Sequence, residues 1–176
     1  MISKIFIMLP SFSLQDKVIA VTGGTGILGN AFNKAIAAAG GSVAIVGRNQ
    51  TVAGERAAEI VANGGKAIAV IADVTKEEDL KNGLTKILDE YGKIDGLVNG
   101  AGGNMPGAVV QPDSDIFQID TNALRQVMDL NLFGTLLPTQ IFGAAIQKTG
   151  RGSIVNISSM TSQQAVTKVL GYSIAK

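Results

Sequence analysis

Two side chains near the C-terminal end have the types and the spacing for acid–base chemistry. Tyr172 and Lys176 are four residues apart in "YSIAK", so on a helix they lie on one face, one turn apart. A lysine ammonium beside a phenol favours the phenolate form, and the pair therefore predicts Tyr172 as a general acid–base that works near neutral pH. A tyrosine four residues before a lysine is a common pattern, so a chance pairing stays open until other residues support it.

Two further polar residues extend this group. Ser159 ends the stretch "VNISS" at the carboxyl end of a predicted strand, where its hydroxyl can hydrogen-bond a carbonyl that is being reduced. Asn131 lies on the predicted helix beside that strand. Asn131, Ser159, Tyr172 and Lys176 together form a candidate catalytic set.

A glycine-rich stretch, "VTGGTGILG" at residues 21–29, indicates a phosphate-binding loop. Gly24, Gly26 and Gly29 match G-x-G-x-x-G between a strand that ends at Thr22 and a helix that opens near Ile27. Glycine permits positive φ and lets backbone amides approach a pyrophosphate at the positive end of the helix dipole. A tight strand–helix turn without a ligand stays open as the alternative.

A nucleotide triphosphatase loop is disfavoured, because such a loop needs a lysine and then a serine or threonine after its last glycine. Here Asn30 and Ala31 follow that glycine. A dinucleotide site usually has an acidic residue at the end of its second strand, and this chain has Arg48 and Asn49 there. A guanidinium can pair with a 2′-phosphate, which favours NADP over NAD unless Arg48 is simply solvated.

Apolar runs of strand length alternate with helical patterns along the chain. The runs are continuous, as expected of parallel strands that are buried on both faces. We expect strands at residues 17–22, 42–47, 67–73, 95–100 and 152–158. The repeated strand–helix–strand unit predicts an α/β fold, a doubly wound parallel sheet of the Rossmann type with its ligand crevice at the carboxyl ends of the strands.

Helix signals fill the intervals between these strands. Gly40 predicts the end of the first helix, and a capping box at Thr75 and Glu78 predicts the start of a later one. A further helix is expected at about 121–147. The long irregular stretch 102–115 leaves the carboxyl end of a strand, so it either borders the ligand site or is an ordinary surface insertion.

Composition narrows the possible functions. The chain has 176 residues, 46% of them hydrophobic, and a net charge of +1, which gives no reason to expect nucleic acid or an acidic membrane surface as a partner. It has no cysteine and no histidine, which excludes disulfides, thiolate catalysis and Ser-His-Asp chemistry and leaves no metal site to expect. Residues 1–13 read as a loose N-terminal extension, with a surface anchor as the alternative, and residues 14–176 as one NAD(P)-binding domain.

From about residue 14 to its end, the chain resembles the short-chain dehydrogenase/reductase family in the order and spacing of its motifs. The motifs are TGGTGILG at 22–29, ADV at 72–74, NGAG at 99–102, LN at 130–131, NISS at 156–159 and Y-x-x-x-K at 172–176. The resemblance implies that Tyr172 exchanges a proton with the substrate oxygen and that Ser159 positions that oxygen. It also implies that Lys176 holds the nicotinamide ribose and that Asn131 anchors a water molecule.

The same resemblance implies a cofactor site. Asp73 would contact the adenine and Asn99 would line the cleft. The expected cofactor-binding residues are Gly23, Thr25, Gly26, Ile27, Gly29, Arg48, Asn49, Asp73, Val74, Asn99, Gly100, Ala101, Tyr172 and Lys176.

Two features depart from the common family pattern. Ile27 occupies a position that is usually glycine, as in the T-G-x-x-G-x-x-G variant of the family. Family members also continue beyond the tyrosine and lysine, so we expect this chain to lack the last two strands and the substrate lid and to be inactive by itself.

The resulting expectation is a cytoplasmic, homo-oligomeric oxidoreductase that uses NADP or NAD. "NGAGGN" and "DLNLFGTLLPTQ" look like the branch of D-mannonate or fructuronate oxidoreductases, which implies a sugar acid as the small-molecule substrate. Two alternatives stay open: a dinucleotide-binding sensor or scaffold without catalysis, and an inactive fragment of a longer enzyme.

Overall fold

A computed structural model describes residues 12–164 and 166–176, so most of the predicted N-terminal extension lies outside the described residues. Five parallel strands form one sheet in the order β3-β2-β1-β4-β5. The strands are β1 (Val18–Thr22), β2 (Ser42–Gly47), β3 (Lys66–Ile71), β4 (Gly96–Asn99) and β5 (Ser153–Asn156). The order reverses direction at β1, which confirms the predicted doubly wound α/β fold.

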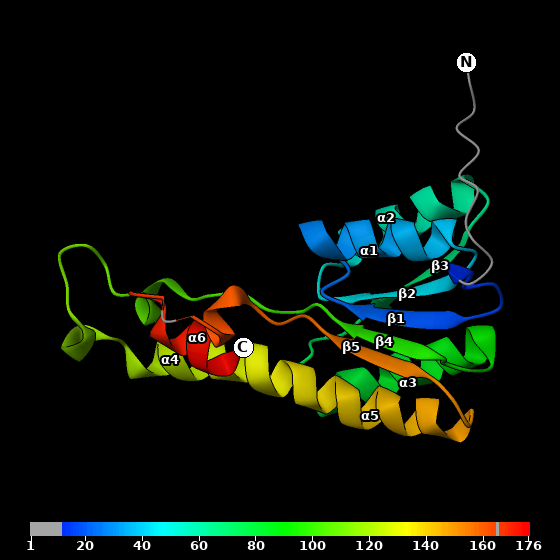
Figure 1. The fold of residues 1–176 in the computed structure, drawn as a ribbon. Helices are drawn as coiled ribbons and strands as arrows, with labels where there is room; N and C mark the ends of the chain where they lie inside the picture. The colour runs from blue at the N-terminus through cyan, green and yellow to red at the C-terminus, as the bar shows by residue number, and fades with distance from the viewer. Residues whose placement is uncertain (1–11, 165) are drawn as a thin grey trace, which may run out of the picture.

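Helices cover both faces of the sheet (Figure 1). Helices α1 (Ile27–Ala38) and α2 (Gln50–Ala62) lie on one face, and α3 (Glu77–Tyr91) and α5 (Gly134–Lys148) lie on the other. Helix α1 ends where expected, because Gly40 has a φ of 87° directly after the capping residue Ala39.

Strand β2 shows how the sheet joins the two layers. All of its residues are buried. Ala44 and Val46 pack with side chains of α3 and α5, whereas Val43 and Ile45 pack with side chains of α1 and α2. A strand buried on both faces therefore reads as an unbroken apolar run, as the sequence has it.

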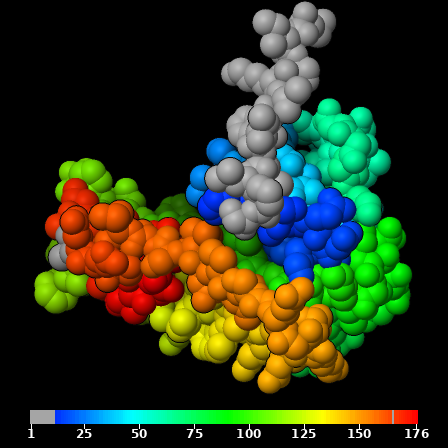
Figure 2. All heavy atoms as spheres, turned by 45° about the vertical axis from the view of Figure 1, so that its right-hand side comes forward, coloured from blue at the N-terminus to red at the C-terminus, as the bar shows by residue number. Residues whose placement is uncertain are grey.

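A smaller lobe extends beyond the carboxyl ends of the strands (Figure 1). It contains α4 (Thr121–Met128), α6 (Leu170–Ala175) and a 3-10 turn at Pro106–Ala108. Its own small core is Ala108, Ala123 and Val127, and Tyr172 packs against that core. In Figure 2 this lobe projects to one side of the body formed by the sheet and its helices.

One local prediction is wrong, and one predicted helix contains a turn that was not predicted. The predicted capping box does not form, because the Thr75 hydroxyl donates to Asp73 Oδ1 at 2.8 Å and Lys76 becomes the N-cap of α3. The helix expected at 121–147 is interrupted by a π-helical turn at Asp129–Phe133 between α4 and α5. In the part of the chain that the structure describes, no helix is long and apolar enough to cross a membrane.

Candidate active site

The glycine loop between β1 and α1 lies tightly against the segment that follows β4. Gly23 has a φ of 66°, and Gly26 N–H closes a turn by donating to Gly23 O at 2.8 Å. A Cβ at Gly23 would lie 2.7 Å from Gly100 O and 2.8 Å from Ala101 N, so only glycine fits there. Thr22 Oγ1 accepts hydrogen bonds from Gly100 N and Ala101 N, both at 3.2 Å, and ties the two segments together.

Several backbone N–H groups of this loop are unpaired. Among residues 12–164 and 166–176, the N–H groups of Thr25, Ile27 and Leu28 have no hydrogen-bond acceptor. They lie at the N-terminus of α1, where the helix dipole favours negative charge. This arrangement fits an anion of the size and charge of a pyrophosphate.

The loop borders a cavity of about 280 Å³ at the carboxyl ends of β1 to β4. The predicted cofactor residues that line it are Gly23, Thr25, Gly26, Arg48, Asp73, Val74, Gly100 and Ala101. Gly47, Ala72, Gly102 and Leu130 also line it, and the sequence reading did not include them. Each of these four residues is next to a predicted site residue or follows a strand. Their small or apolar side chains carry no chemical group that would mark them as ligand-binding in the sequence.

Other predicted cofactor residues lie outside the lining of this cavity. Ile27 is 90% exposed at the start of α1, and Gly29 lies under the loop, where a Cβ would overlap Gly23 O. Asn49 is the N-cap of α2 and accepts from Val52 N at 3.0 Å. These three residues belong to the start of α1 and the N-cap of α2, next to the cavity, and they are not part of its lining.

Asn99 is buried at the end of β4 and also lies outside the lining. Its Nδ2 donates to Thr139 Oγ1 at 2.9 Å and to Asn156 Oδ1 at 2.8 Å. These bonds join β4, α5 and β5 directly below the site. Asn99 therefore holds the elements that carry the candidate catalytic residues.

The far end of the cavity carries a pair of opposite charges. Arg48 Nη1 lies 4.0 Å from Asp73 Oδ2, and the Arg48 side chain is 75% exposed. Burial raises the pKa of the Asp73 carboxyl, but hydrogen bonds from Thr75 and the charges of Arg48 and Lys76 together hold it below its ordinary value. Asp73 is thus a carboxylate at neutral pH, and the exposed Arg48 guanidinium can still pair with an anion.

Tyr172 lies in α6, and Lys176 is the C-cap of this helix, with its N–H donating to Tyr172 O at 3.1 Å. Lys176 Nζ is 6.0 Å from the centre of the Tyr172 ring and donates to Ile157 O at 2.9 Å. Burial lowers the pKa of the Lys176 ammonium. Lys176 thereby ties α6 to the segment after β5 and places a cation beside the tyrosine.

Asn131 meets Lys176 at the edge of the cavity. Its side chain lies in the π-helical turn, donates to Gly103 O at 2.7 Å and Val127 O at 2.8 Å, and accepts from Gly103 N at 3.1 Å. A Cβ at Gly102 would lie 2.7 Å from Asn131 Oδ1 and 2.9 Å from Lys176 Nζ. Gly102 also lines the cavity, so Asn131 Oδ1 and Lys176 Nζ both lie beside its lining.

Ser159 lies on the neighbouring segment. It caps the 3-10 turn Met160–Ser162 by accepting from Thr161 N at 3.2 Å. In the described ranges no hydrogen bond joins it to Tyr172 or Lys176. Its own hydroxyl hydrogen is therefore available to a ligand.

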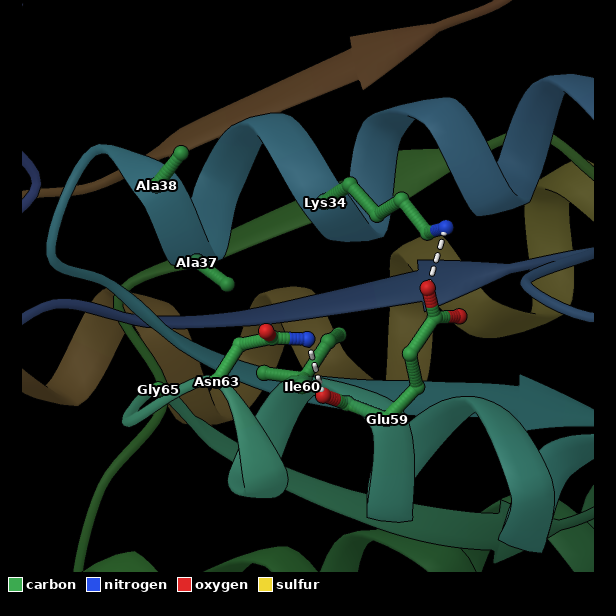
Figure 3. A pocket seen from close by; sticks show the side chains of 7 residues that line it. All are labelled: Lys34, Ala37, Ala38, Glu59, Ile60, Asn63 and Gly65. Atoms are coloured by element: carbon green, nitrogen blue, oxygen red, sulfur yellow. Dashed lines mark hydrogen bonds and ion pairs between the residues drawn. The ribbon is translucent and has the colours of Figure 1, made fainter. Parts of the chain in front are cut away.

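Two other cavities lie away from these residues. One of about 580 Å³ lies along β1, β4 and β5 and includes Asp95 and Arg151. Another of about 270 Å³ lies between α1 and α2, where Lys34 Nζ and Glu59 Oε1 form an ion pair at 2.6 Å (Figure 3). Residues 12–164 and 166–176 contain no cluster of three metal-ligating side chains.

A comparison with known proteins matches this chain to one protein family. Residues 17–176 match the sequence pattern of the short chain dehydrogenase family. An uncharacterized oxidoreductase of Bacillus subtilis, UxuB, is 36% identical over 172 residues, which cover 93% of this chain and 62% of that protein. This chain therefore spans about three fifths of the length of such a relative.

Solved structures of similar proteins have the same fold as this chain. A proposed D-mannonate oxidoreductase from Haemophilus influenza with bound NAD is 35% identical, with a TM-score of 0.86 over 94% of this chain and 62% of that one. A 7α-hydroxysteroid dehydrogenase with NADH and an oxo bile acid is 28% identical, with a TM-score of 0.84 over 96% of this chain and 64% of that one. Both share their fold with nearly the whole of this chain.

Proposed function

This chain belongs to the short-chain dehydrogenase family, and from that premise we propose that it supplies the cofactor cleft and the catalytic residues of an NAD(P)-dependent oxidoreductase that interconverts a hydroxyl and a carbonyl. One observation carries the proposal. Gly102 lines the cleft and lies against both Asn131 Oδ1 and Lys176 Nζ, so the cleft ends at the candidate catalytic group.

The side chains would divide the chemistry among them. The nicotinamide ring, when bound, gives or takes the hydride. Tyr172 donates its hydroxyl proton to the substrate oxygen during reduction and takes it back during oxidation. The Ser159 hydroxyl donates a hydrogen bond to that oxygen, and the Lys176 ammonium stabilises the tyrosine anion. Asn131 holds the loop at Gly103 and would anchor a water molecule that passes protons to solvent.

For the cofactor, we propose NADP ahead of NAD. The support is Arg48, whose exposed guanidinium lies directly after β2 and can pair with a 2′-phosphate. A carboxylate at this position, as NAD-binding proteins usually have, would repel that phosphate. Two similar structures hold NAD and NADH, so NAD is the alternative and both cofactors belong in every assay.

For the substrate, we propose a sugar acid such as mannonate or fructuronate, which places the protein in carbohydrate metabolism. The support is the similarity to a proposed D-mannonate oxidoreductase. The irregular stretch 102–115 also reaches the site, because Val110 N donates to Lys168 O at 2.8 Å, four residues before Tyr172. A stretch held beside Tyr172 in this way would border a substrate.

A substrate panel tests the proposal. Sugar acids, steroids, acyl thioesters and simple alcohols are each incubated with NAD or NADP, and the change in nicotinamide absorbance is followed. Turnover of sugar acids supports the assignment, and turnover of the apolar substrates alone contradicts the substrate class. Saturable dinucleotide binding without turnover, both in this chain and in a form of the family's full length, favours the sensor or scaffold alternative. Turnover by the longer form alone favours the inactive-fragment alternative.

We also propose a cytoplasmic homo-oligomer. Phe133 is 45% exposed and Leu136 is 43% exposed on the outer face of the π-helical turn and α5, which gives apolar surface for a second copy. Light scattering measures the assembly. A monomer at all concentrations contradicts this part of the proposal.

A further inference from the structure

Arg56 contacts the glycine loop from outside the cleft. It lies on α2, and its Nη1 donates to Gly24 O at 2.6 Å and to Gly26 O at 2.7 Å. Nη1 carries two hydrogens, so one nitrogen serves both carbonyls. A single cation thus fixes two peptide groups of the loop, those on either side of the Thr25–Gly26 peptide.

Both of these peptide groups have a free N–H. Gly24 C=O shares its peptide group with Thr25 N–H, and Gly26 C=O shares its peptide group with Ile27 N–H. Within the described residues, neither N–H has an acceptor. In a planar trans peptide the C=O and the N–H point in opposite directions, so holding the carbonyls toward α2 turns both N–H groups away from it.

The charge of Arg56 also strengthens these donors. Hydrogen bonds in series polarise one another, and a bond from a guanidinium is stronger than one from a neutral group. A peptide whose C=O accepts from Arg56 therefore has a more positive N–H at its other end. The effect adds to the helix dipole at the start of α1.

Asn33 supports the same geometry from α1. It is fully buried, and its Nδ2 donates to Gly24 O at 2.9 Å. Gly24 O thus accepts from two side chains on two helices. The peptide group it belongs to is held from both sides, which leaves little freedom for Thr25 N–H to turn.

We propose that Arg56 is a positioning residue for the pyrophosphate of the dinucleotide. It acts through the loop, by orienting and polarising the N–H groups of Thr25 and Ile27, and not by touching the substrate or the nicotinamide. The inference rests on the proposed function, since the ligand is the dinucleotide of that site. It adds a residue that no motif of the sequence indicates.

The chain offers a matched control. Lys34 and Glu59 form an ion pair between the same two helices (Figure 3), and among the described residues Lys34 Nζ donates to Glu59 and to no atom of the glycine loop. Lys34→Met removes one cation between α1 and α2, as Arg56→Met does. The two variants differ in their contact with Gly24 and Gly26.

The experiment titrates the full chain with NADPH and with NADH by calorimetry, for wild type, Arg56→Met, Arg56→Lys and Lys34→Met. We expect Arg56→Met to weaken binding about tenfold, because two charge-assisted hydrogen bonds are lost. Arg56→Lys should lie between wild type and Arg56→Met, because the charge stays and the planar donor pair is lost. Lys34→Met should bind within about twofold of wild type.

Each outcome decides a separate question. If wild type binds neither dinucleotide, the proposed function and this inference fall together. If wild type binds and Arg56→Met binds equally well, the inference is wrong and the proposed function stands. Equal weakening by Arg56→Met and Lys34→Met would show a general effect of helix packing and also overturn the inference. Should Arg56→Met not fold, Arg56→Lys decides, and wild-type affinity in that variant contradicts the proposal.

Discussion

At the scale of single residues, Tyr172 carries the proposed proton transfer. In a protein of the family's full length, we expect Tyr172→Phe to lower turnover at least about 100-fold, because the phenyl ring fills the same space and has no proton to exchange. Dinucleotide affinity should change less than about twofold, since Tyr172 packs against Ala108, Ala123 and Val127 and not in the glycine loop. Initial rates and cofactor titrations on both forms give the comparison. Similar rates would remove Tyr172 from the mechanism.

Arg48 tests the choice of cofactor. We expect Arg48→Ala to weaken NADPH binding by about tenfold and NADH binding by less than twofold, because only NADPH carries the 2′-phosphate. The neighbouring Asp73 keeps its hydrogen bonds to Thr75 in this variant. Equal losses for the two cofactors would mean that Arg48 is a solvated surface residue.

The candidate catalytic residues were the easiest to propose from sequence, because a tyrosine, a lysine, a serine and an asparagine carry chemistry in their side chains. Arg56 was not predicted. An arginine in the middle of a helix looks like a surface residue, and its bonds to Gly24 and Gly26 depend on the distance between α1 and α2. Contacts between a side chain and a distant backbone carbonyl leave no pattern in one sequence.

At the scale of elements, the turn from β1 to α1 depends on glycine for space. We expect Gly29→Ala to destabilise the protein by about 1–3 kcal/mol and to abolish dinucleotide binding, because its Cβ would overlap Gly23 O and lie 2.8 Å from Gly24 Cα. Gly54→Ala in α2 is the control, since a Cβ there meets nothing within 4 Å. That variant should gain about 0.5–1 kcal/mol. Urea unfolding measures both, and an unaffected Gly29→Ala would contradict the tight loop.

Asp95 joins β1 to β4 at the opposite end of the sheet from the site. Its carboxylate accepts from Val18 N at 2.9 Å and pairs with Lys17 and Lys93. Burial raises the pKa of the Asp95 carboxyl, but the Val18 N–H and the two lysines outweigh it and hold that pKa below its ordinary value. The folded form therefore binds this proton less tightly than the unfolded form does.

The sign of the pH dependence follows. A depressed pKa in the folded state means that Asp95 stabilises the protein above pH about 4 and that this stability is lost as the pH falls further. Asp95→Asn should cost about 1–3 kcal/mol at neutral pH and flatten the acid limb of the stability curve. Unfolding free energies measured across the acid range test this. An acid limb that is the same in both proteins would contradict it.

Element boundaries show where local sequence reasoning fails. The sequence predicted the strands within two residues because each strand is a continuous apolar run, although every residue of β5 is exposed. It missed the true start of α3, because the Asp73 carboxylate competes with the backbone for Thr75. It also missed the π-helical turn at Asp129–Phe133, since one added residue in a helix has no signature in composition.

At the scale of the whole molecule, the predicted doubly wound sheet and the family are confirmed. The α/β alternation follows from the period of apolar residues, and that period is local. The lobe of α4 and α6 was not predicted as a unit, because it depends on contacts between residues 105–128 and α6 that are far apart in the chain. The expected inactivity of this chain by itself stays a prediction, as do its substrate and its assembly.

The central claim is that a dinucleotide binds between the glycine loop and Asp73 with its nicotinamide end toward Lys176. Amide NMR spectra of the labelled chain, recorded during titration with NADPH or NADH, test this claim residue by residue. We predict saturable shifts at Thr25, Ile27 and Val74, together with Gly102 beside Lys176, and unchanged amides in the cavity between α1 and α2. Shifts that are absent, or that gather around Lys34 and Gly65 instead, would contradict the account.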